Sequence, residues 1–115
     1  MGLAELLEIR PGVTAVIGGG GKTTLLRTLG EELAAGGARV LLCASTKIFP
    51  FQGLTNLKDP SERTLADALE TCPLLCAGTP VPGTGKLTAP RIPMARLAAL
   101  AEYVLAEADG AAGRP

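Results

Sequence analysis

Residues 13–35 decide the fold, and they read VTAVIGGGGKTTLLRTLGEELAA. The first five residues are apolar or β-branched and are flanked by glycine, which predicts a short buried strand. From Lys22 to Ala35 the leucines recur at the spacing of one face of an amphipathic helix, and Gly36 and Gly37 are expected to end that helix. A strand, a glycine-rich turn and a helix in this order predict the start of a parallel α/β sheet.

The glycine cluster between this strand and this helix predicts a phosphate-binding loop, or P-loop. Glycine frees successive backbone N–H groups to point inward, so that they form an anion-binding nest at the positive end of the helix. In this interpretation Lys22 contacts the β- and γ-phosphates of a nucleotide, the Thr23 hydroxyl binds Mg²⁺, and Thr24 faces the α-phosphate. The residues expected to bind the nucleotide here are Gly18, Gly19, Gly20, Gly21, Lys22, Thr23 and Thr24.

The loop departs from the strict P-loop pattern, because Val16 stands where that pattern begins with glycine. Its context still favours the phosphate-binding interpretation, since the Gly-Lys-Thr follows a buried strand and opens a helix. The competing dinucleotide-binding pattern, Gly-x-Gly-x-x-Gly, requires glycine at the position of Thr23 and therefore fails.

Composition narrows the function classes. Apolar residues make up 47% of the chain and charged residues 19%, which is typical of a folded globular protein. The 11 basic residues balance the 11 acidic ones, so we expect binding to neither nucleic acid nor a membrane. The sequence has no histidine, its 3 cysteines are expected to be reduced and mostly buried, and the N-terminus lacks the features of a signal peptide. We therefore expect a cytoplasmic protein.

The remainder of the chain alternates between helical and strand patterns. The segments expected to form helices are residues 3–9, 61–71 with Ser61 as N-cap, and 92–101, and those expected to form strands are residues 39–44, 74–78, 85–88 and 103–110. The strands at 74–78 and 85–88 are predicted to form a hairpin at the edge of the sheet, and residues 45–60 a long functional loop.

These patterns predict a P-loop NTPase-like, three-layer α/β/α fold with a mostly parallel sheet. The 115 residues are expected to form a single nucleotide-binding domain. P-loop domains usually need further strands to complete the sheet, so we expect an incomplete domain that corresponds to the N-terminal part of a longer architecture.

Polar side chains follow the second and last predicted strands, where parallel sheets place their ligands. Thr46 is a candidate hydroxyl for Mg²⁺ or the γ-phosphate, and Lys47 a candidate phosphate contact. Glu107 and Asp109 lie two residues apart and so point to the same side of the last strand. Either of them could hold Mg²⁺, while the other orients a water or an acceptor hydroxyl. Lys86 is expected to be a solvated turn lysine.

Three segments together resemble the selenium-dependent hydroxylase accessory protein family, YqeC. These segments are the loop Gly18–Thr24, the post-strand run Ser45-Thr46-Lys47, and the block Glu107-Ala108-Asp109-Gly110, which is the most specific. The resemblance implies a P-loop nucleotide-binding protein that assists the maturation of molybdenum hydroxylases, with such a hydroxylase or its cofactor-handling proteins as partners. Family members continue past Arg114 and Pro115, in keeping with an incomplete domain.

Three functions are compatible with these residues. The first is a nucleoside triphosphatase that acts as an assembly factor, in which ATP or GTP is held with Mg²⁺ by Lys22, Thr23 and Asp109. The second is a small-molecule kinase, in which Glu107 or Asp109 activates an acceptor hydroxyl. The third is a nucleotide-dependent binding module without significant hydrolysis. The lack of an arginine-bearing lid, apart from Arg91 and Arg96, mildly disfavours the kinase.

Overall fold

The computed structural model describes residues 2, 7–16 and 22–108, and Lys22 and Thr23 only in their helical backbone. The described residues form an α/β fold of alternating strands and helices. They are β1 (Gly12–Val16), α2 (Lys22–Ala35), β2 (Val40–Ala44), β3 (Thr55–Lys58), α3 (Glu62–Thr71), β4 (Leu74–Val81), β5 (Lys86–Thr88), α4 (Met94–Leu100) and β6 (Tyr103–Glu107). The predicted α/β class with a mostly parallel sheet is confirmed.

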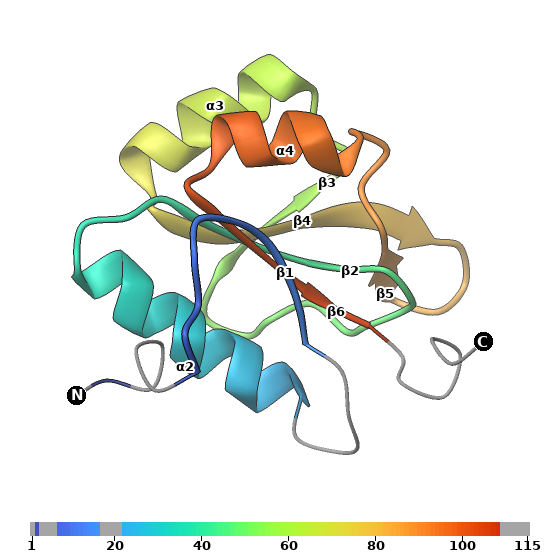
Figure 1. Ribbon diagram of the computed structural model, residues 1–115. Helices are drawn as coiled ribbons and strands as arrows, with labels where there is room; N and C mark the ends of the chain where they lie inside the picture. The colour runs from blue at the N-terminus through green and yellow to red at the C-terminus, as the bar shows by residue number, and fades with distance from the viewer. Residues whose placement is uncertain (1, 3–6, 17–21, 109–115) are drawn as a thin grey trace.

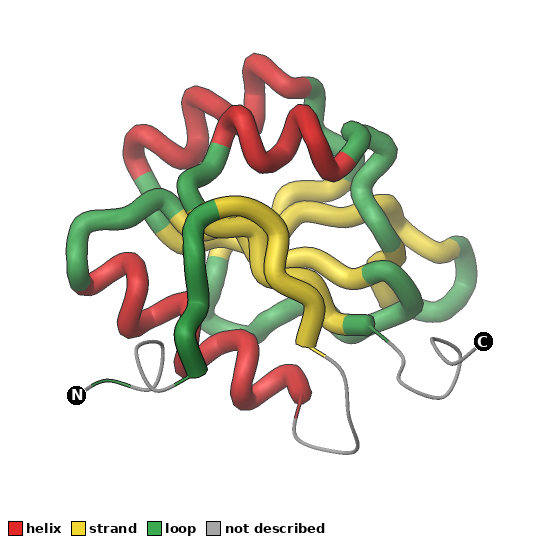
Figure 2. The backbone as a smooth tube through the Cα atoms, viewed as in Figure 1, coloured by secondary structure: helices red, strands yellow, loops and turns green. Residues whose placement is uncertain are grey.

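The sheet is parallel along the order β1-β6-β2-β4-β3, and β5 joins β4 in antiparallel pairing. The strand nearest the C-terminus, β6, thus lies between β1 and β2. Helix α2 covers one face of this sheet, while α3 and α4 cover the other (Figure 1). The strands form the middle of three layers (Figure 2).

The core divides between the two faces according to the alternation of side chains along the strands. Beneath α2 lie Leu42 and Leu105 with the helix residues Leu26 and Leu29, and the opposite face packs Leu41 and its neighbours against α3 and α4. Strand β2 is buried along its whole length, which explains its uninterrupted apolar sequence. Complete burial of each leucine contributes about 1.5–3 kcal/mol to stability.

The helix ends follow the predicted signals. Ser61 caps α3, and its hydroxyl accepts a hydrogen bond from the Thr64 N–H at 3.1 Å. After α2, Gly37 has φ of +98°, and the N–H of Ala38 donates to the Leu33 carbonyl at 3.2 Å. These contacts form the glycine-dependent Schellman ending.

Two of the cysteines are part of this core. Cys43 and Cys76 are buried and unbridged, and Cys72 is half-buried. Burial raises the pKa of Cys43 to about 12, and burial, with a smaller effect of the neighbouring Cys43, raises the pKa of Cys76 to about 12. Both thiols therefore act as small apolar side chains.

Three segments differ from the sequence predictions. Residues 45–60 are not a continuous loop, because β3 forms within them by parallel pairing with β4. The predicted hairpin exists, but β4 is internal: residues 74–78 lie between β2 and β3, and only residues 79–81 pair with β5. In the predicted helix at 3–9, Leu7 and Glu8 form a turn, and residues 3–6 lie outside the described residues.

Candidate functional site

The carboxyl ends of three parallel strands meet at one edge of the sheet. In the register of the sheet, Glu107 of β6 lies beside Val16 of β1 on one side and Ala44 of β2 on the other. Hydrogen bonds between the strand ends stabilise this edge, since the backbone N–H and the hydroxyl of Ser45 donate to the Glu107 carbonyl at 2.9 and 3.1 Å. The N–H of Ala108 likewise donates to the Val16 carbonyl at 3.0 Å.

An open cleft of about 590 Å³ lies between this edge, α2 and β5. It is lined by Thr24, Arg27, Thr28 and Glu31 of α2, by residues 47–52, by Lys86 of β5 and by Glu107 of β6. Residues far apart in the sequence are therefore brought to one concave surface at the carboxyl ends of the strands. Ligands bind at this position in open α/β sheets.

Glu107 is the most unusual residue of the cleft. It is only 7% exposed, and it is the one charged residue found buried in the described part of the chain. It alternates in step with Leu105, so it faces the α2 side of the sheet. Burying a carboxylate is costly unless a cation or hydrogen-bond donors compensate its charge. A carboxylate at a strand end beside a cleft can serve as an oxygen ligand for a metal cation.

The segment between β2 and β3, residues 45–54, forms the outer wall of the cleft and is called here the β2–β3 loop. Ile48 makes an antiparallel bridge to Leu87, with hydrogen bonds of 2.8 and 2.7 Å. Asn56 closes the other end, because its side chain bonds both the N–H and the carbonyl of Phe51 at 2.9 and 2.8 Å. The loop is therefore anchored at both ends.

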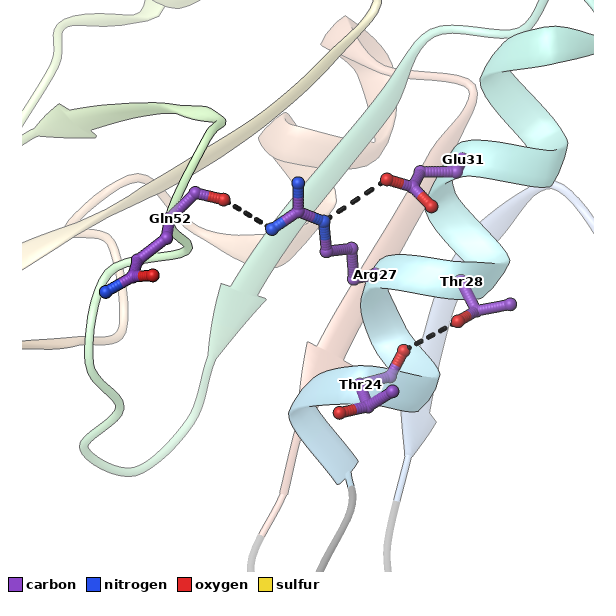
Figure 3. A network of polar contacts seen from close by, with 5 residues as sticks. All are labelled: Thr24, Arg27, Thr28, Glu31 and Gln52. Atoms are coloured by element: carbon purple, nitrogen blue, oxygen red, sulfur yellow. Dashed lines mark hydrogen bonds and ion pairs between the residues drawn. The ribbon is translucent and has the colours of Figure 1, made fainter.

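Arg27 connects this loop to α2. Its guanidinium donates to the Gln52 carbonyl and also pairs with Glu31, one turn further along the helix, at 3.2 Å (Figure 3). A side chain at Gly53 would come within 3.1 Å of this guanidinium, and Gly53 has φ of +81°. Glycine at position 53 thus permits both the turn and the close approach of Arg27.

Two lysines and an aromatic ring also line the cleft. Lys47 and Phe49 belong to the β2–β3 loop, and the Lys86 ammonium lies 5.0 Å from the centre of the Phe49 ring. That distance is within the range of a cation–π interaction. Lys86, expected from the sequence to be a solvated turn lysine, thus lines the cleft.

Several potential features have no counterpart among the residues that the structure describes. No group of three or more His, Cys, Asp or Glu side chains that could hold a metal ion occurs there. None of the helices in this part of the chain is long and apolar enough to cross a membrane.

Among known protein families, one described as YqeC protein matches residues 14–115. The chain belongs to the YqeC family. No curated protein and no solved structure matches it. Membership of the YqeC family is consistent with an accessory role for selenium-dependent hydroxylases.

The match to the YqeC family begins within β1 and includes all of the cleft. Three of the residues predicted from the sequence to form the site, Thr24, Lys47 and Glu107, line the cleft together. Thr46 is half-buried and does not line it. The predicted residues that lie outside the described part of this YqeC chain are Gly18, Gly19, Gly20, Gly21 and Asp109, together with the side chains of Lys22 and Thr23.

Besides Lys86, the residues of the cleft that the sequence did not point to include Arg27 and Phe49 of this YqeC protein. Arg27 has the spacing of a solvated helix pair with Glu31, and nothing local indicates its contact with the β2–β3 loop. Phe49 gives a weak signal, as an aromatic residue placed shortly after the end of a buried strand. Phenylalanine is usually buried, so its 63% exposure could be found only from the structure.

Proposed function

We propose that this protein binds a nucleoside triphosphate, ATP or GTP, with Mg²⁺, and that it acts as an NTPase-type accessory factor in the maturation of selenium-dependent molybdenum hydroxylases. The main support is the position of Glu107, a buried carboxylate at the carboxyl end of a central strand, in a cleft shared with Thr24 of the α2 N-terminal turn. The sequence between β1 and α2 includes Gly18–Gly21, and α2 begins with Lys22 and Thr23. Helix N-termini of this kind favour phosphate.

Mg²⁺ is the companion ion that we propose for the nucleotide. Mg²⁺ prefers oxygen ligands, and in nucleotide sites it takes only one or two from the protein because phosphates and waters supply the rest. Thr23 and Asp109 are the proposed protein ligands, and the buried Glu107 offers a further carboxylate. When bound, the ion would neutralise charge on the phosphates.

The accessory role assigns a function to the β2–β3 loop. Arg27 connects the loop to the helix that begins at the proposed phosphate site, so movement of that helix end would reach the loop through a hydrogen bond to Gln52. In nucleotide switches, a segment of this kind is ordered or released according to the state of the γ-phosphate. We propose that the loop presents the nucleotide state to a molybdenum hydroxylase or to a protein that handles its cofactor in the cytoplasm.

The kinase alternative receives less support. Its lid arginines would have been Arg91 and Arg96, which pair with Asp59 at 3.5 Å and Glu62 at 2.8 Å. Glu62 raises the pKa of Arg96 through its hydrogen bond and its charge. Neither arginine lines the cleft. The binding-module alternative differs from the proposal only in the rate of hydrolysis, so turnover measurements separate the two.

Calorimetry of Mg-ATP and Mg-GTP binding tests the proposal. Lys22→Ala should weaken binding by about tenfold or more, because a charge-assisted hydrogen bond contributes about 1.5–3 kcal/mol. Lys58→Ala, at an exposed position of β3, is the matched control and should bind as the wild type does. Glu107→Gln should reduce the gain in affinity that Mg²⁺ provides and leave metal-free binding intact.

The outcome that refutes nucleotide binding is the absence of binding to the wild-type chain for both nucleotides, or equal binding by Lys22→Ala and Lys58→Ala. Turnover is then measured with and without a hydroxylase partner. A rate that increases with the partner supports the NTPase-type factor, whereas binding without turnover supports the binding module.

A further inference from the structure

Phe49 is a large apolar side chain that is exposed to solvent. It is 63% exposed, whereas Phe51, two residues further on, is 3% exposed and belongs to the core. An aromatic ring left in water forgoes the apolar burial that stabilises most phenylalanines. Its ring contributes to the cleft rather than to the core.

The backbone that carries this ring is well anchored. On one side Ile48 is hydrogen-bonded to Leu87 at 2.8 and 2.7 Å, and on the other the Phe51 N–H is bonded to the Asn56 side chain at 2.9 Å. In the state that the structure shows, the ring is therefore presented from a segment that hydrogen bonds hold on both sides. Such preorganisation lowers the entropy cost of binding a ligand.

The charges around the ring favour an anion. Lys86 lies over the ring, and Lys47 lines the cleft two residues before it. Among the described residues neither lysine forms an ion pair, whereas the charge of Arg27 is balanced by Glu31. The wall formed by the β2–β3 loop and β5, called here the outer part of the cleft, thus combines an aromatic surface with two ammonium groups.

The cleft is long enough for more than the phosphates of a nucleotide. Its α2 wall runs from Thr24 to Glu31, which at 1.5 Å per residue corresponds to about 10 Å along the helix. Phosphates bound at the α2 N-terminus would occupy the Thr24 end. Phe49, Lys47 and Lys86 line the cleft from the β2–β3 loop and β5, not from α2, and would remain available for another group.

We propose that the outer part of the cleft binds a second small molecule, a planar aromatic ring that carries a phosphate or carboxylate, beside the nucleotide. The ring stacks on Phe49, and the anionic group is held by Lys47 and Lys86. This inference rests on the proposed function in one respect, namely that the nucleotide occupies the Thr24 end. It assigns Glu107 and the N-terminal turn of α2 to the nucleotide and its metal, and the wall formed by the β2–β3 loop and β5 to the second ligand.

Flavin mononucleotide, a fluorescent planar ring with one phosphate, is a suitable probe, and riboflavin is the same ring without the phosphate. We expect flavin mononucleotide to bind the wild-type chain in saturating Mg-ATP, and riboflavin to bind more weakly. Phe49→Ala should weaken flavin mononucleotide binding at least about fivefold, in line with the effect of removing one aromatic stacking partner. Lys86→Ala should weaken it by about fivefold as well, whereas Phe49→Tyr and the control Lys58→Ala should keep it.

Three results would overturn the inference. The first is the absence of flavin mononucleotide binding to the wild-type chain, and the second is equal binding by wild type and Phe49→Ala. The third is competition, in which Mg-ATP displaces flavin mononucleotide or loses affinity in Phe49→Ala, because the ring would then serve the base of the nucleotide itself. If flavin mononucleotide binds through Phe49 while Mg-ATP does not bind at all, the subsite stands and the proposed nucleotide function fails.

Discussion

Replacing Gly78 with alanine tests how tightly the cleft wall is built. Gly78 is the residue of β4 where parallel pairing with β3 ends and antiparallel pairing with β5 is about to begin. A methyl carbon at this position would lie 2.7 Å from the Thr88 carbonyl oxygen and 2.9 Å from Cβ of Leu87. Both contacts are too short, and both are made by atoms close to the backbone, so β5 itself would have to move.

The expected cost follows from two opposing effects. Overpacking in a well-packed core typically costs about 1–3 kcal/mol. Alanine also reduces the freedom of the unfolded chain, which returns about 0.4–1 kcal/mol. We therefore expect Gly78→Ala to lower the free energy of unfolding by about 1–2 kcal/mol, and the Tm by about 4–8 °C for a domain of this size.

Urea denaturation followed by circular dichroism measures this change, with Gly36→Ala as the matched control. At Gly36 the nearest atoms to an added methyl group are the Leu33 and Glu32 carbonyl oxygens at 3.5 and 3.8 Å, which are ordinary contacts. The control should therefore be as stable as the wild type or slightly more stable. Equal stability of Gly78→Ala and wild type, or an equal loss in both variants, would refute the packing argument.

Four further predictions concern other parts of the chain. Ser61→Ala removes the α3 N-cap and should lower the free energy of unfolding by about 1 kcal/mol in the same urea assay; no change would mean that the cap bond is replaced by water. Arg27→Ala should speed hydrogen exchange in the β2–β3 loop while changing stability by less than about 1 kcal/mol, because the guanidinium is partly exposed; unchanged exchange would argue against the connection to α2. A thiol reagent at pH 8 should label Cys72 before Cys43 and Cys76. Because burial raises the pKa of the last two to about 12, their contribution to stability should be complete below pH 9 and lost as the pH rises toward 12, and a flat profile in this range would contradict their burial.

The sequence alone was sufficient to predict the helices and strands that have strong local signals. The bounds of α2 match the prediction, because its leucine spacing and its terminal glycines are both local signals. The apolar runs of β2 and β6 likewise predicted strands that are buried on both faces. At the site, the positions of Lys47 and Glu107 followed from the rule that ligands gather at strand ends.

What escaped prediction depends on contacts between distant residues. Strand β3 has the sequence TNLK and is half-exposed, so it has no apolar run, and only its pairing with β4 makes it a strand. The contact of Arg27 with Gln52 spans 25 positions and ends on a backbone carbonyl, which no side-chain pattern reveals. The internal position of β4 was missed because it depends on pairing with β2 and β3, and the sequence of β4 does not indicate its neighbours in the sheet.

The central position of β6 has a consequence for how the chain acquires its structure. The first strand pairs with β6, through contacts such as Gly12 with Tyr103, and has no pairing with β2. When the chain is made from its N-terminus, β1 and the β1-facing edge of β2 therefore have no native pairing partner until residues 103–107 have been made. Such late, long-range pairing slows folding and leaves strand edges open in the meantime. The edge that carries Glu107, and with it the complete lining of the cleft, therefore forms only after residues 103–107 have been made.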